Sequence, residues 1–264
     1  MKAGHDERCD PEHCYMWTAR VSEPAYKAFY RKTLNTREWC IEVETIIEHR
    51  PSFSVLKARL SPGETISVEA GSYMLHKGEV EIQTKTGGLL KGLARSLLGG
   101  ESLFINTFIA RSSAEIWIAP SVMGDIVEVD LNGTLYIQDT SYLAHTGDVS
   151  ISVGWRGLKG LLAEGELVWL KAEGRGKMFI NSYGAIELIE LKPGEKMTID
   201  NMHFVAMDGS VEWKTRKFGG LKSFIFGGEG IVMDVYGPGR VWVQSRNLPV
   251  FASILSKYLP ESGK

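Results

Sequence analysis

The chain offers few side chains whose type and spacing suit catalysis. His76 and His145 each stand two residues before a turn glycine in closely similar surroundings, and paired histidines are common metal ligands and general bases. The third occurrence of the same pattern carries Met207 in that place. This argues against a shared chemical role, and we interpret both histidines as polar residues that flank turns.

Three glutamates recur in the same way. Glu101, Glu166 and Glu229 each follow a glycine, and together they could form a ring of general bases. The alternative is that they are solvated or pair with nearby lysines and arginines, as carboxylates beside turns usually do. The chain has no Gly-x-Ser-x-Gly motif and no Walker pattern, so the local signatures of serine hydrolases and nucleotide-binding loops are both missing.

The N-terminal region contains the four residues that most resemble zinc ligands in type: His5, Cys9, His13 and Cys14. Their spacing matches no standard zinc finger, and no second ligand pair follows. The odd number of cysteines, three, also argues against a disulfide framework. We therefore expect that the protein is not an enzyme and binds no metal and no cofactor. Residues 1–40 are expected to form an N-terminal arm that is poorly ordered or partly helical.

Composition narrows the range of partners. Thirty basic and thirty-two acidic residues give a net charge of −2, which provides no general field for nucleic acid and argues against it as a partner. No apolar run reaches the roughly 18 to 20 residues that cross a bilayer, and residues 1–20 lack the apolar core of a signal peptide. We expect a cytoplasmic protein, free or peripheral at a membrane.

The elements that must position these residues are mainly strands. Period-two alternation of apolar and polar residues predicts strands within residues 40–47, 114–120, 125–131 and 240–245. Gly63, Gly133 and Gly194 follow proline or asparagine, which predicts positive φ in tight hairpins. Helix is expected only in residues 23–34, in the first of the loops described next and in the tail at 251–260. The strand tryptophans Trp117, Trp155, Trp169, Trp213 and Trp242 are interpreted as core rather than as a stacking surface.

A series of landmarks occurs three times in one order. Each turn glycine is followed by a strand, a second glycine turn, a glycine-leucine segment and a Gly-Glu step. This predicts three tandem β units, at residues 41–105, 106–170 and 171–250, and a C-terminal tail at 251–264.

The three glycine-leucine loops, near residues 87–101, 156–166 and 219–229, combine apolar and basic side chains. Two interpretations stay open: the apolar residues cap the core, or the loops contact an anionic membrane surface or a membrane-associated protein. The residues assigned to the second interpretation are Leu89, Lys91, Leu93, Arg95, Leu97, Arg156, Leu158, Lys159, Leu221, Lys222 and Phe224.

Residues 51–74, 87–104 and 179–191 resemble the family of the altered inheritance of mitochondria protein 24. The resemblance implies an all-β fold of three tandem β-sandwich units, each similar to the tryptophan RNA-binding attenuation protein. It also implies a homotrimer whose nine units form a pseudo-ninefold ring, and it brings no catalytic residues. Our first hypothesis is a trimeric scaffold that presents its loops. The alternatives are an RNA-binding ring, which would use Lys214, Arg216 and Lys217, and a protein that binds a small ligand between repeats.

Overall fold

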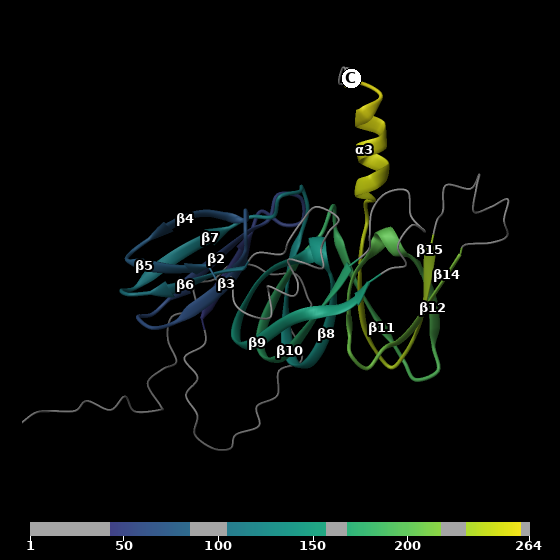
Figure 1. Cartoon of the computed structure of the whole chain (residues 1–264), viewed down its shortest axis with the longest axis horizontal. Helices are drawn as coiled ribbons and strands as arrows, with labels where there is room; N and C mark the ends of the chain where they lie inside the picture. Colours follow the sequence, from purple (N-terminus) through teal and green to yellow (C-terminus); the bar gives the residue numbers. More distant parts are fainter. Residues whose placement is uncertain (1–42, 85–104, 157–167, 218–230, 260–264) are drawn as a thin grey trace, which may run out of the picture. The chain divides into compact units, whose positions relative to one another are not determined.

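The structure is a computed structural model that describes residues 43–84, 105–156, 168–217 and 231–259. These residues belong to one compact unit, Glu42–Lys264. They form sixteen strands, two short 3-10 helices and the α-helix α3, so the prediction of an all-β protein is confirmed (Figure 1). The arm at residues 1–40 and most of the three glycine-leucine loops lie outside the described residues.

The elements follow one another in a simple order. They are β1 (Glu44–Glu48), β2 (Val55–Leu60), β3 (Thr65–Glu69), β4 (Tyr73–Lys77), β5 (Val80–Thr84), β6 (Ile105–Ala110), β7 (Ala114–Ile118), β8 (Ile126–Gln138), η1 (Asp139–Ser141), β9 (Tyr142–Arg156), β10 (Val168–Asn181), β11 (Ile186–Leu191), β12 (Lys196–Asp200), η2 (Asn201–His203), β13 (Phe204–Asp208), β14 (Glu212–Lys217), β15 (Ile231–Tyr236), β16 (Gly239–Gln244) and α3 (Leu248–Ser256). The boundary predicted between residues 170 and 171 lies inside β10.

The strands form three sheets whose ladders are antiparallel. One sheet has the order β1-β2-β7-β4, a second has the order β11-β16-β13-β8-β10-β9-β3-β6-β5, and the third has the order β12-β15-β14. The alternation of residue types explains the burial of the strands, because every second side chain of β7 is buried. The strands predicted at 114–120, 125–131 and 240–245 are confirmed. Of the segment at 40–47, the structure describes only the part within β1.

Two short ladders join distant parts of the chain within the nine-stranded sheet. β3 pairs with β9 through Ser67–His145 and Val68–Ala144. β13 pairs with β8 through residues 206–208, where Met207 lies opposite Tyr136. Each of these ladders covers one edge strand with a strand that comes much later in the sequence.

The turn glycines have the predicted conformation but do not make the predicted hairpins. Gly63, Gly133 and Gly194 have φ of 90°, 125° and 83°. However, β2 and β3 lie in different sheets, as do β11 and β12, and Gly133 lies inside the continuous strand β8. At Gly63 and Gly194 the positive φ turns the chain from one sheet to another, and at Gly133 it bends a long strand. No hairpin forms because the strands on either side of each glycine pair with other strands.

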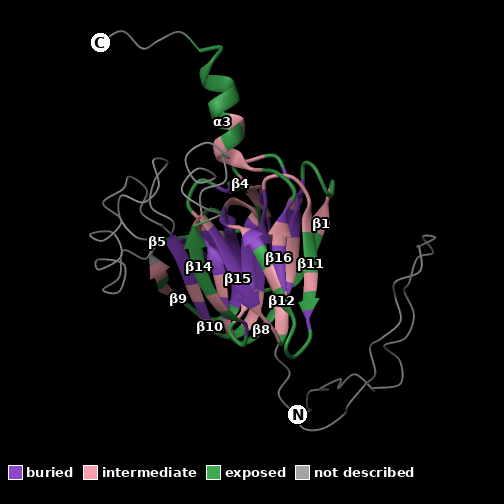
Figure 2. Ribbon diagram, turned by 90° about the vertical axis from the view of Figure 1, so that its right-hand side faces the viewer, coloured by how far each residue is buried: buried purple, intermediate pink, exposed green. Residues whose placement is uncertain are grey.

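The core lies between the sheets. One cluster of buried residues combines Leu56 of β2 with Ile66 of β3, so the four-stranded and nine-stranded sheets pack against each other. Another combines Val241 of β16 with Met233 of β15, and it joins the nine-stranded sheet to the three-stranded one. Figure 2 shows the buried residues gathered in the middle of the stacked strands, whereas the exposed residues lie mainly at the turns and in α3.

Tryptophans supply much of one core cluster, as predicted. Trp169 is fully buried, and its ring contacts those of Trp155, Trp213 and Phe204 at centroid distances of 4.7, 4.6 and 4.7 Å. Trp242 is also buried. This arrangement uses the large apolar area of the indoles for packing, which supports the core interpretation.

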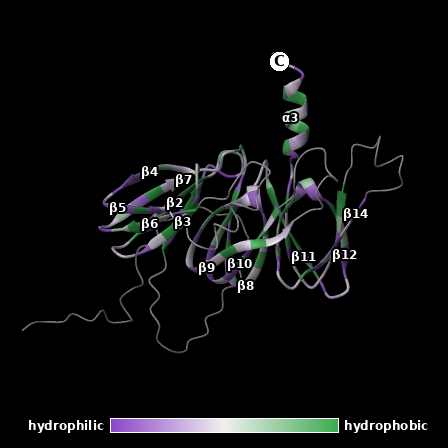
Figure 3. Cartoon of the chain, viewed as in Figure 1, coloured by the Kyte–Doolittle hydropathy of each residue, from purple (hydrophilic) through white to green (hydrophobic). Residues whose placement is uncertain are grey.

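The chain continues beyond β16 into α3. Asn247 caps the helix, because its side chain accepts a hydrogen bond from the backbone N–H of Val250, and a proline stands in the first turn. The helix begins three residues before the predicted tail segment. Figure 3 shows its hydrophobic residues standing clear of the strands, and none of them is buried.

Candidate functional site

The candidate site is a pocket where the connections between strands meet. We call it the rim pocket, and it has a volume of about 410 Å³. Its walls come from the β1–β2, β7–β8, β10–β11 and β16–α3 connections, so residues from all parts of the described chain contribute. The main lining side chains are those of Pro51, Phe53, Met123, Tyr183, Ser245 and Arg246.

Backbone hydrogen bonds hold these connections side by side. The N–H of Ser54 donates to the carbonyl of Gly124, and the N–H of Asp125 donates to the carbonyl of Gly184, at 3.2 and 2.9 Å. The N–H of Ser245 then donates to the carbonyl of Ala185 at 3.0 Å. A Cβ atom at Gly124 would collide with the carbonyl of Ser182, so the close approach requires glycine there. The base of the pocket is therefore a continuous set of bonded segments.

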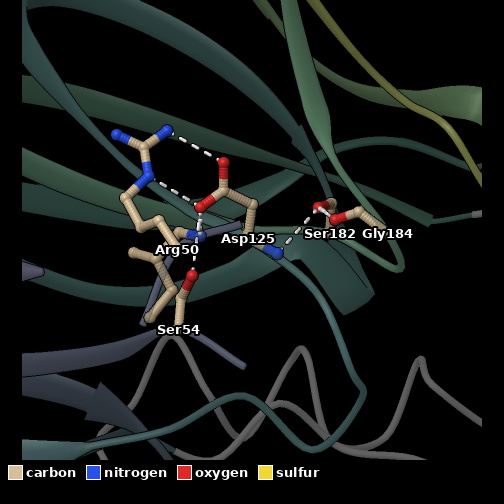
Figure 4. A network of polar contacts seen from close by, with 6 residues as sticks. Arg50, Ser54, Asp125, Ser182 and Gly184 are labelled. Atoms are coloured by element: carbon tan, nitrogen blue, oxygen red, sulfur yellow. Dashed lines mark hydrogen bonds and ion pairs between the residues drawn. The ribbon is translucent and has the colours of Figure 1, made fainter. Parts of the chain in front are cut away.

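A buried carboxylate fixes the first of these segments. Asp125 accepts two parallel hydrogen bonds from the guanidinium of Arg50, Nε–Oδ1 at 2.7 Å and Nη2–Oδ2 at 2.8 Å (Figure 4). The hydroxyl of Ser54 and the N–H of Ile126 also donate to Oδ1, at 3.0 and 2.8 Å. Bidentate pairing of this kind adds geometric specificity as well as energy. It ties the β1–β2 connection to the start of β8.

The surroundings of Asp125 set its charge. Burial by itself raises the pKa of this carboxyl, but the hydrogen bonds and charge of Arg50 and the hydroxyl of Ser54 outweigh burial and bring the pKa below its ordinary value. The carboxylate is therefore ionised at neutral pH. Its acceptor positions are occupied by structural donors, so its role is to hold the connections together.

The lining determines which ligands the rim pocket could take. Phe53 and Met123 are 66% and 51% exposed, and Tyr183 contacts the Phe251 ring of α3 at 5.6 Å. Arg246 adds a guanidinium to a lining that is mainly apolar but also contains Ser52 and Ser245. Such a pocket suits an apolar group next to an anion. Within residues 43–84, 105–156, 168–217 and 231–259, no group of three or more His, Cys, Asp or Glu side chains is arranged to hold a metal ion.

Most of the residues predicted to contact a partner lie outside the described residues. These are Leu89, Lys91, Leu93, Arg95, Leu97, Leu158, Lys159, Leu221, Lys222 and Phe224. Arg156 is the last residue of β9 and its backbone pairs with Val168. The glutamates at 101, 166 and 229 and the cysteine-histidine set at residues 5–14 also lie outside the part of the chain that the structure describes.

The two histidines discussed from the sequence make the same contact. His76 Nδ1 lies 2.9 Å from the hydroxyl of Tyr73, and His145 Nδ1 lies 2.8 Å from the hydroxyl of Tyr142. In both pairs the two residues are three positions apart in the same strand, which supports the interpretation of the histidines as structural polar residues. Sequence reasoning missed Arg50 and Asp125, which are 75 residues apart.

The described chain therefore belongs to the class of all-β proteins built from packed antiparallel sheets. Backbone hydrogen bonds link the strand connections beside the rim pocket. Residues 46–246 match the family model described as Mitochondrial biogenesis AIM24, and the chain belongs to that family. Among the helices of the described residues, none is long and apolar enough to cross a membrane.

Two streptococcal proteins are similar to this chain. An uncharacterised protein of Streptococcus pyogenes serotype M6 is 30% identical over 226 residues, which cover 82% of this chain and 91% of the relative. The crystal structure of protein SPYM3_0169 from Streptococcus pyogenes aligns with a TM-score of 0.70 and 30% identity, over 83% of this chain and 100% of that one.

Proposed function

We propose that three copies of this chain close into a β ring that serves as a scaffold and has no catalytic function. The observation that carries the proposal is a pair of complementary sheet edges. In the described residues, β4 ends the four-stranded sheet and β12 ends the three-stranded sheet. Unpaired edges invite pairing with another chain, and a head-to-tail contact that closes removes both at once.

The internal ladders supply the expected register of that contact. Aligning the chain on Gly78, Gly147 and Gly209 places β3, β8 and β12 in equivalent positions, and likewise β4, β9 and β13. Ser67–His145 and Tyr136–Met207 are then the same pair at two places. The third occurrence pairs Thr198 of one copy with His76 of the next, and Ile199 with Leu75.

The same alignment explains why the sheets are unequal. Within the chain, β5-β6-β3 continues into β9-β10, and β9-β10-β8 continues into β13-β16-β11. The sheets β12-β15-β14 and β1-β2-β7-β4 correspond to the two halves of one more such sheet. Pairing β12 with β4 of a neighbouring copy completes it. Three copies would give nine units, each similar to the tryptophan RNA-binding attenuation protein.

A scaffold role is favoured because two buried carboxylates, Asp125 beside the rim pocket and Asp234 on β15, are engaged in structure. Asp125 is held by Arg50 and Ser54, and Asp234 by Arg216, Lys196 and Thr198. The pairing of Arg216 with Asp234 at 3.0 Å also weighs against the RNA-binding alternative, since it neutralises one of the three basic residues assigned to RNA. The rim pocket keeps the small-ligand alternative open.

Disulfide trapping tests the proposed register. In a background with Cys9, Cys14 and Cys40 changed to serine, Thr198→Cys with His76→Cys should form a covalent trimer on oxidation, because directly paired Cα atoms lie about 4.5–5.5 Å apart. The matched control is Thr198→Cys with Met74→Cys, two residues out of register, which should crosslink poorly.

Light scattering provides the independent measurement of mass. The wild-type peak should correspond to three times 29.3 kDa. A peak of one chain mass would refute the ring, and equal crosslinking of the two cysteine pairs would refute the register.

A further inference from the structure

The C-terminal helix α3 has no buried residue to explain its composition. Residues 248–256 contain no Asp, Glu, Lys or Arg, and at helical spacing Val250, Phe251, Ile254 and Leu255 share one face while Ser253 and Ser256 lie on the other. Val250, Ile254 and Leu255 are each about half exposed. An apolar helix face is normally packed against a core, so this one requires a covering surface.

The exposed apolar surface continues from α3 onto the rim pocket. The ring of Phe251, on α3, contacts Tyr183, which lines the pocket together with the exposed side chains of Phe53 and Met123. Beyond the helix, Tyr258 and Leu259 are 83% and 67% exposed. We call these residues of α3, its C-terminal extension and the pocket the rim-helix surface. A contiguous apolar surface of this kind marks an interaction site.

The charged residues that flank the helix in the sequence have a single sign. Arg246 precedes the helix and Lys257 follows it, while residues 245–260 contain no acidic residue. Cations at both ends of an apolar helix, with a tyrosine beside one of them, suit the boundary between lipid headgroups and acyl chains. Nine residues span only about 13 Å, well short of the roughly 30 Å hydrocarbon core, so the helix can enter one interface but cannot cross the bilayer.

We propose that the rim-helix surface inserts shallowly into membranes that contain anionic lipids. α3 and its extension supply the inserted apolar residues, and Arg246 and Lys257 contact lipid phosphates. This inference rests on the proposed ring in one respect: a trimer carries three copies of the surface, and their binding adds by multivalency.

The test is co-sedimentation with vesicles of phosphatidylcholine mixed with phosphatidylglycerol. Changing Ile254→Asp and Leu255→Asp together should raise the lipid concentration for half-maximal binding at least about tenfold, because charged side chains resist transfer into the interface. Leu188→Asp is the matched control: Leu188 is 49% exposed on β11 and is not part of the rim-helix surface, and its replacement should leave binding unchanged. Arg246→Gln with Lys257→Gln should weaken binding to these vesicles, and none of the variants should bind pure phosphatidylcholine more tightly than the wild type.

Light scattering on the same samples separates the possible failures. If the Ile254/Leu255 variant loses trimers while the Leu188 variant keeps them, α3 is a contact between copies and the lipid inference is wrong. Binding equal to that of the wild type, or a wild type that binds neither kind of vesicle, also overturns it. If the wild type is a monomer, the ring fails separately, and vesicle binding that still depends on Ile254 and Leu255 supports the rim-helix surface without it.

Discussion

Strands β4 and β9 each begin with a tyrosine that is followed three residues later by a histidine, but the two strands have different surroundings. Tyr73 and Met74 of β4 are 40% and 47% exposed, whereas Tyr142 and Leu143 of β9 are fully buried. Both strands carry the same tyrosine-histidine hydrogen bond. The difference comes from β3, which pairs with β9, while β4 has a partner on one side only among the described residues. Local sequence determines that each segment forms a strand, and the presence of a second paired strand determines how far its side chains are buried.

The burial of Tyr142 also affects its ionisation. Burial raises the pKa of the Tyr142 hydroxyl well above its ordinary value, and the charge of Glu69 adds to this. The phenol at this junction therefore stays neutral and can donate a hydrogen bond to its surroundings.

The largest effect is expected from placing a charge directly after the first tyrosine of β9 or β4, at Leu143 or Met74. Leu143→Asp puts an unpaired carboxylate in the core and should destabilise the chain by about 4 kcal/mol or more, enough to unfold it. Met74→Asp should leave the monomer folded but prevent trimers from forming. Urea unfolding measures the first effect and light scattering the second. A trimeric Met74→Asp protein would contradict the proposed edge.

A second prediction concerns the interior rim. Arg50→Ala leaves the buried Asp125 without its bidentate partner and should cost about 2 kcal/mol, less than for a fully buried pair because Arg50 is half exposed. Arg59→Ala, which removes exposed ion pairs to Glu44 and Glu115, is the control and should cost much less, because exposed ion pairs contribute little to stability. Equal losses in urea unfolding would show that the Asp125 pairing has no special importance.

Acid should remove the stabilisation that the Arg50–Asp125 pair provides. Because the pKa of Asp125 is lower in the folded protein than its ordinary 3.8, the unfolded chain binds the proton more readily. The stabilisation is therefore present above about pH 3.8 and is lost as pH falls through that value toward the lower folded pKa. Asp125→Asn should flatten this part of the stability curve, measured by urea midpoints across the acid range. An unchanged acid dependence would assign the loss to other carboxylates.

The smallest effect on the fold is expected from the loops. Replacing Lys91, Arg95, Arg156, Lys159 and Lys222 with glutamine should leave the trimer and its urea midpoint unchanged. Each basic residue near an anionic surface contributes about 1 kcal/mol, so vesicle binding should fall and become less dependent on salt if the loops face the membrane. Unchanged binding would favour the packing interpretation.

Much of the local structure was accessible from sequence. Alternation located β7, β16 and the first half of β8, and glycine placement predicted the positive φ of Gly63 and Gly194. The hairpins were wrong because a turn's φ does not specify which strand its neighbours pair with. The Arg50–Asp125 pair was missed because no local pattern links residues 75 positions apart.

The sequence by itself determined several strands, the positive φ of their turn glycines and a helix in the C-terminal tail, since these depend on side chains a few residues apart. Only the tertiary structure decided that β3 covers β9 while β4 stays at an edge, and that Asp125 is bound to Arg50. It also brought Phe53, Met123 and Tyr183 to one pocket beside α3. Burial and pairing depend on which segments meet in space, and that results from packing the whole chain around its core.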